Sequence, residues 1–146
     1  MEEEMEDKLR RRIRNYSAEE LLREGKKYAA DSRYFEARVV FAEGTSRKMV
    51  RETSGLYLSI ILSVNSSRVV NKNNHKQDNS IIDKIVHCMM ESTRMHAEKT
   101  LSNEDLFILE CLIDRVPFKT MVVPNRDEFE SLYSRFKEYV SNVFLR

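Results

Sequence analysis

Residues 21–44 carry the sequence LLREGKKYAADSRYFEARVVFAEG. Large and small side chains recur in it three or four residues apart, which is the spacing of one face of an α-helix. The polar residues Asp31–Arg33 interrupt this spacing and predict a tight turn. We therefore expect two antiparallel helices, with Gly25 and Ala37 small enough to let the helices approach each other closely.

The order of side-chain sizes in this segment follows a known pattern of large apolar, small and aromatic positions. The pattern is met by Leu21, Gly25, Tyr28, Tyr34, Ala37 and Phe41, and Gly44 adds a small residue late in the second helix. In this respect residues 18–50 resemble a tetratricopeptide repeat (TPR), and later residues match it only in degenerate form. The resemblance implies a binding scaffold of stacked helix pairs. The microtubule-interacting-and-transport module, a three-helix family, has a similar pattern.

The remainder of the chain is also helix-prone, because 146 residues contain only three glycines and two prolines while 34% are charged. We predict an all-α fold of about seven helices, stacked as a short, right-handed, TPR-like array. A charged N-terminal helix or arm occupies residues 1–16, and residues 17–146 form a single helical-repeat-like domain. The expected pairs are 17–30 with 33–49, 54–70 with 80–98, and 102–115 with 126–145.

Local signals set the expected boundaries of these helices. Ser17 with Glu20 forms a capping-box pattern, and the further predicted N-caps are Ser80, Ser102 and Asn125. Thr53–Gly55 is expected to punctuate the chain before the apolar run 56–70. The polar residues 71–79 predict a loop, and Met121–Val123 is the one segment where a strand could form.

Charge is segregated at the N-terminus, although the net charge is only +1. Residues 2–7 are mostly acidic, and the following basic residues are candidate phosphate contacts: Lys8, Arg10, Arg11, Arg12 and Arg14. Leu9 and Ile13 interrupt the basic run at helical spacing, which favours docking of this helix onto the rest of the protein. Contact with nucleic acid or the ribosome is the alternative.

The resemblance also implies where a partner would bind, since the first helix of each pair lines the concave face in that family. The implied partner-binding residues are Arg23, Lys26, Ser59, Ser63 and Asn65. Arg23 and Lys26 would attract acidic side chains, while Ser59 and Asn65 would hydrogen-bond a ligand backbone.

Some members of the family hold the acidic C-terminal tail of a chaperone in a clamp of lysine, asparagine and further basic residues. Here Leu22 stands at the lysine position, Lys26 at the first asparagine and Ser59 at the second. A carboxylate clamp needs such groups to converge on one anion. The sequence therefore argues against binding of a chaperone tail.

Cysteine, histidine and methionine give no catalytic or metal signature. His87 and Cys88 are adjacent and point to different helix faces, and four converging ligands for zinc cannot be assembled, so we expect no metal, no cofactor and no enzyme activity. Buried free thiols are the expectation for Cys88 and Cys111. Ordinary core packing is the first interpretation of the methionines; an adaptable apolar groove is the alternative, formed by Met49, Met89, Met90, Met95 and Met121.

These features favour a non-enzymatic scaffold or adaptor that binds a peptide or helix of a partner protein. The alternative is a ribonucleoprotein- or ribosome-associated factor that uses the basic arm at 8–14. A regulatory helical bundle with the same helix count is a third class, without hallmark motifs here. We expect a cytoplasmic location, with a nuclear one as the alternative, and no membrane segment.

Overall fold

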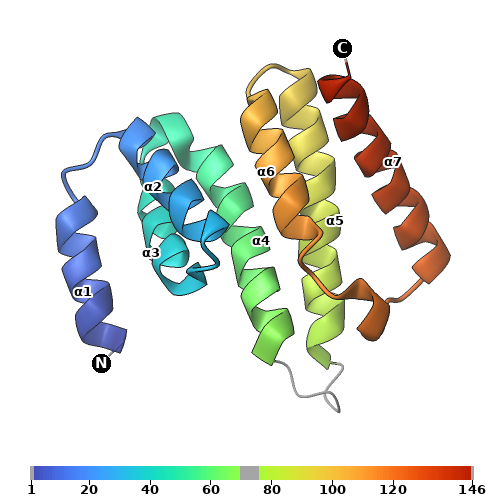
Figure 1. Cartoon of the computed structure of the whole chain (residues 1–146), viewed down its shortest axis with the longest axis horizontal. Helices are drawn as coiled ribbons and strands as arrows, with labels where there is room; N and C mark the ends of the chain where they lie inside the picture. The colour runs from blue at the N-terminus through green and yellow to red at the C-terminus, as the bar shows by residue number, and fades with distance from the viewer. Residues whose placement is uncertain (1, 70–75, 146) are drawn as a thin grey trace. The chain divides into compact units, whose positions relative to one another are not determined.

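The computed structural model describes residues 2–69 and 76–145, which are helical with short connections and contain no strand (Figure 1). The described α-helices are α1 (Glu2–Ile13), α2 (Ala18–Ala30), α3 (Tyr34–Gly44), α4 (Arg51–Val69), α5 (Lys76–Ala97), α6 (Asn103–Ile113) and α7 (Arg126–Phe144). Two short 3-10 helices, η1 (Lys48–Val50) and η2 (Phe118–Thr120), lie in the connections. The predicted all-α fold of about seven helices is confirmed.

Contacts within the chain divide it into two units, Met1–Leu62 and Ser63–Arg146, and α4 runs across the boundary. Within the first unit, α3 packs against both α2 and α1. Within the second unit, α5, α6 and α7 each contact the other two. The helices predicted over 102–115 and 126–145 therefore do pack together, as α6 and α7. They are not an isolated pair, because α5 packs against both of them. In the described residues, no helix has the length and apolar character needed to cross a membrane.

Several predicted helix boundaries are wrong. The helix expected over 33–49 ends at Gly44, because Thr45 and Ser46 turn the chain and their hydroxyls donate hydrogen bonds to the carbonyl oxygens three residues back, those of Ala42 and Glu43. Thr53–Gly55 does not punctuate the chain, since α4 already begins at Arg51.

The predicted cap at Ser80 is also wrong, because α5 begins at Lys76 and includes Ser80. Residues 76–79 of the predicted loop are thus helical, and residues 71–75 lie outside the described residues. The capping box of Ser17 and Glu20 is confirmed, and the Ser102 side chain accepts from the Asp105 amide as predicted. Asn125 precedes α7 with a left-handed φ of 50° and makes no side-chain cap bond.

Close packing of α2, α3 and α4 centres on the ring of Phe41. A Cβ atom placed on Gly25 would lie only 2.5 Å from the tip of this ring. The face of the same ring stacks on Tyr57, with ring centroids 4.6 Å apart and an interplanar angle of 7°. Position 25 therefore requires a small residue, as predicted, because the Phe41 ring fills the adjacent space and Tyr57 prevents it from moving away.

The N-terminal helix is docked, as the apolar spacing of the basic run predicted. Leu9 and Ile13 are buried in the core of the first unit with Leu21, Val39 and Val40. The connection after α1 is also held, because the Arg47 guanidinium donates to the carbonyl oxygens of Arg14 and Tyr16, each at 2.8 Å.

Replacement of Gly25 by alanine should lower the free energy of unfolding by about 1–3 kcal/mol, because the new methyl group overlaps the fixed Phe41 ring. Gly55→Ala is the matched control, since a Cβ at Gly55 has nothing within 4 Å. That change should raise the free energy of unfolding by about 0.5–1 kcal/mol through helix propensity. Urea unfolding of both variants measures the contrast. Equal effects at the two glycines would contradict the packing described.

Docking of α1 predicts that Ile13→Ala costs about 2–4 kcal/mol of stability, because it opens a cavity in the first unit. Met5→Ala, on the same helix but with Met5 54% exposed, should change stability by less than about 0.5 kcal/mol. Thermal unfolding followed by circular dichroism compares the two variants. An Ile13→Ala protein as stable as the parent would show that α1 is a free arm.

Candidate functional site

The five residues implied as partner contacts differ in exposure and are divided between the two units. Arg23 and Asn65 are exposed, and Lys26 and Ser59 are half-buried. Ser63 is only 1% exposed, so its hydroxyl is not presented to a partner, and this part of the prediction is corrected. Arg23, Lys26 and Ser59 belong to the first unit, whereas Ser63 and Asn65 belong to the second.

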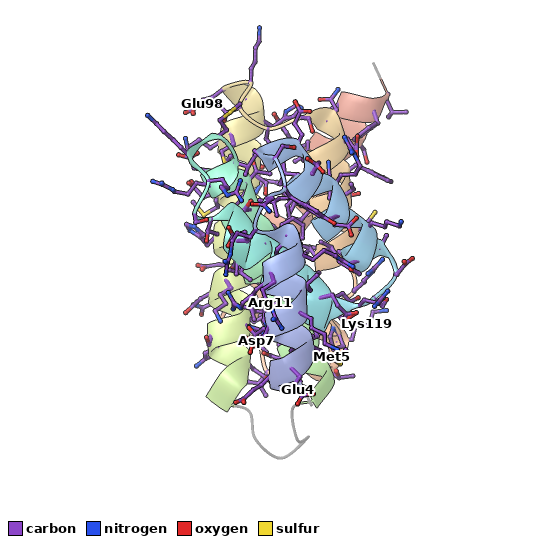
Figure 2. All side chains as sticks on the ribbon, turned by 90° about the vertical axis from the view of Figure 1, so that its left-hand side faces the viewer. Glu4, Met5, Asp7, Arg11, Glu98 and Lys119 are labelled. Carbon is purple, nitrogen blue, oxygen red and sulfur yellow. The ribbon has the colours of Figure 1, made fainter. Side chains whose placement is uncertain are left out.

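The basic run on α1 is partly neutralised within the first unit. Arg10 pairs with Glu6 at 2.7 Å. Arg12 pairs with Glu24 at 3.4 Å and donates a hydrogen bond to the Tyr28 hydroxyl at 2.6 Å. The other cations of the run are exposed, namely Lys8, Arg11 and Arg14. Arg11 extends from α1 together with the acidic side chains of Glu4 and Asp7 (Figure 2), so the outer face of this helix carries both signs of charge.

A more complete site lies within the second unit, where α5 and α7 run parallel. At the start of α5, the Asp78 carboxylate accepts a hydrogen bond at 2.8 Å from the amide of Val122, in the segment that leads into α7. Towards the ends of the two helices, His96 Nδ1 lies 2.7 Å from the Tyr139 hydroxyl. His96 Nε2 lies 2.6 Å from Asn103 Oδ1 and donates to it, so in a neutral imidazole Nδ1 accepts from Tyr139.

The entry into α7 is fixed by Arg126. Its guanidinium donates to the carbonyl oxygens of Phe118 at 3.2 Å and Met121 at 2.8 Å. The residue before it, Asn125, reverses the chain with its left-handed backbone. These contacts hold the segment between α6 and α7 against the first turn of α7.

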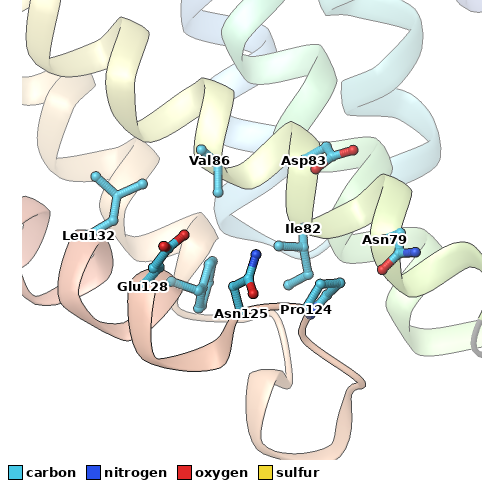
Figure 3. A pocket seen from close by; sticks show the side chains of 9 residues that line it. Asn79, Ile82, Asp83, Val86, Pro124, Asn125, Glu128 and Leu132 are labelled. Carbon is cyan, nitrogen blue, oxygen red and sulfur yellow. The ribbon is translucent and has the colours of Figure 1, made fainter.

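Two hollows of about 420 and 410 Å³ follow the seam between α5 and α7, and Leu132 lines both. We call them together the α5–α7 groove. The first is lined by Asn79, Ile82, Asp83, Val86, Pro124, Asn125, Glu128, Phe129 and Leu132. In Figure 3, Ile82 and Val86 of α5 point towards Asn125 and Glu128 at the start of α7. The second is lined by Met89, Met90, Thr93, Arg94, Leu132, Arg135, Phe136 and Tyr139.

The middle of the groove is apolar and open to solvent. Phe129 and Phe136 are buried in its floor with Met89, while Leu132 is half-buried. Met90 is 58% exposed at its edge. An exposed thioether beside a buried aromatic floor provides a surface that adapts to different apolar side chains.

The methionine groove considered from the sequence is therefore formed only in part. Met89 and Met90 line the α5–α7 groove, as one alternative expected. Met95 and Met121 are buried, and Met49 is 89% exposed in the first unit, so these three do not contribute to the lining. The other wall comes from α7, through Phe136 and Tyr139 among others.

The two ends of the groove differ in charge. Asp83 and Glu128 are exposed at the end where α5 and α7 begin. Arg94 and Arg135 line the other end. Arg94 is paired with Glu91 at 2.9 Å and with Glu98 at 2.8 Å on its own helix, so the cation most available to a partner is Arg135.

The thiols do not form a reactive site. Cys88 is buried as expected, and burial raises the pKa of its thiol to about 12, so it stays protonated near neutral pH. Cys111 is half-buried. The pKa of its thiol is also raised, mainly by burial and to a smaller extent by the neighbouring Glu110 carboxylate. Across the described ranges, no group of three or more His, Cys, Asp or Glu side chains is placed to hold a metal ion.

Comparison with known proteins gives no assignment, since no family model matches this chain and neither a curated protein nor a solved structure matches it.

The burial of the thiols predicts how they react with a maleimide at pH 7. In the folded protein Cys111 should react slowly and Cys88 should not react, whereas both should react in denaturant. Cys111→Ser isolates Cys88, and Cys88→Ala isolates Cys111. Intact mass measured over time gives the rates. Fast labelling of folded Cys111→Ser protein would contradict the placement of Cys88 in the core.

Proposed function

We propose that this protein is a non-enzymatic interaction module whose α5–α7 groove binds an amphipathic helix of a partner protein. The observation that carries the proposal is the open apolar seam between two parallel helices, with Leu132 at its centre and Met90 at its edge. A helix laid into such a groove buries its apolar face and keeps its polar face in water.

The dimensions of the groove suit a helix of about four turns. The lining residues of α5 run from Asn79 to Arg94. At 1.5 Å per residue this is a length of about 22 Å, equivalent to roughly 15 residues of a ligand helix. Apolar anchors at i, i+3, i+4 and i+7 would then meet the half-buried side chains along the floor.

A helical ligand is favoured over an extended one because addition of a strand requires an exposed sheet edge. The described residues contain no strand to serve as that edge. The resemblance of residues 18–50 to a TPR supports the general role of a scaffold, with Arg23 and Lys26 as a second candidate surface. The ribonucleoprotein alternative remains a prediction for the exposed cations of α1.

Introduction of a charge at the apolar edge of the groove tests this proposal. Met90→Glu should weaken binding of helical peptides at least tenfold, because a carboxylate would be desolvated against the apolar floor. Met49→Glu is the matched control, since Met49 is more exposed than Met90 and lies in the first unit. Binders are selected from a displayed library of 15-residue helical peptides, and their Kd values are measured for both variants.

Thermal unfolding first establishes that both variants are folded. Equal Kd values for Met90→Glu and the parent, or a selection that yields no binder, would reject the groove as the binding site. Loss of binding in Met49→Glu alone would place the site in the first unit.

A further inference from the structure

The charges at the two ends of the α5–α7 groove carry an inference about its partner, which rests on the function proposed above. We infer that the partner helix is bipolar: basic side chains at one end lie over Asp83 and Glu128, and acidic side chains at the other lie over Arg135. Between them the partner carries an apolar stripe that meets Leu132 and Met90.

The spacing of the groove charges sets the spacing expected in the partner. Glu128 and Arg135 both line the groove from α7 and are seven residues, or about 10 Å, apart along that helix. Asp83 and Arg94 line it from α5 and are eleven residues, or about 16 Å, apart. The charges of a partner helix should therefore be separated by two to three turns.

The ion pairs between the partner helix and the two ends of the groove contribute more to specificity than to affinity. Asp83, Glu128 and Arg135 are exposed, and exposed ion pairs contribute little to affinity and are screened by salt. A like charge placed over either end would instead be repelled, which discriminates against helices of uniform charge. Arg94, already paired with Glu91 and Glu98, adds its aliphatic stem more than its charge.

A different protein is the expected source of this helix. The α1 segment of the chain itself has an acidic start, a basic end and an apolar stripe. Its Leu9 and Ile13 are already buried in the core of the first unit, however, so a second copy could offer α1 only by opening that core. A helix that lies free on its own protein would not have this cost.

Three synthetic 15-residue peptides with the same leucine stripe test the inference. One carries lysines at one end and glutamates at the other, one carries only lysines, and one carries only glutamates. In 50 mM salt the parent protein should bind the bipolar peptide about tenfold more tightly than either uniform peptide, and in 0.5 M salt the difference should largely disappear. Fluorescence anisotropy measures each Kd.

The double change Asp83→Lys with Glu128→Lys makes both ends basic and should reverse the preference, so that the all-glutamate peptide binds most tightly. The matched control is Glu2→Lys with Glu3→Lys on α1, which also replaces two exposed acids and should leave the preference unchanged. Thermal unfolding of both variants establishes that they are folded.

The possible outcomes separate the inference from the proposed function. Equal binding of all three peptides, still lost in Met90→Glu, would overturn the bipolar partner and leave the groove as a helix site. Binding that is insensitive to Met90→Glu would reject the groove itself. A concentration-dependent dimer in sedimentation velocity, abolished by Met90→Glu, would overturn a separate partner in favour of a second copy.

Discussion

The hydrogen bond from the Val122 amide to the Asp78 carboxylate fixes the start of α7 against the start of α5. Asp78 is buried, and a hydrogen bond to a carboxylate is stronger than one to a neutral acceptor, so this contact restrains the segment before α7. The contact between His96 and Tyr139 restrains the other ends of the two helices. The groove exists because two parallel helices are tied by polar contacts at both ends and meet only a shallow apolar floor between them.

The first unit has close helix packing centred on the ring of Phe41. Its helices approach closely because the Phe41 ring lies over Gly25, where no Cβ intervenes, and stacks on Tyr57. The central helix of this unit, α3, packs against both α2 and α1. Leu9 and Ile13 of α1 lie in a core with Val39 and Val40 of α3. In the second unit, by contrast, Met90 is exposed beside the buried rings of Phe129 and Phe136. This exposed apolar surface is the reason why we propose the partner site there.

Much of the fold could be predicted because its signals are local. The capping box at Ser17 and the small residue at Gly25 act over one or two helical turns, and both are found as expected. Ser80 failed as a cap because α5 already begins at Lys76, and its first turn includes Asp78, whose carboxylate accepts from the distant Val122 amide. The whole groove could not be predicted, because it depends on which helix lies beside α7; the methionine spacing indicated only the part lined by Met89 and Met90.

Methyl NMR of the protein with labelled methionine and isoleucine tests the central claim most directly. Met90 and Ile82 report on the groove, while Met5 and Met49 are exposed reporters in the first unit. On titration with a selected helical peptide, we expect saturable shifts of the Met90 and Ile82 methyl signals, with those of Met5 and Met49 unchanged. Shifts of Met5 or Met49 without any change at Met90 would contradict this claim.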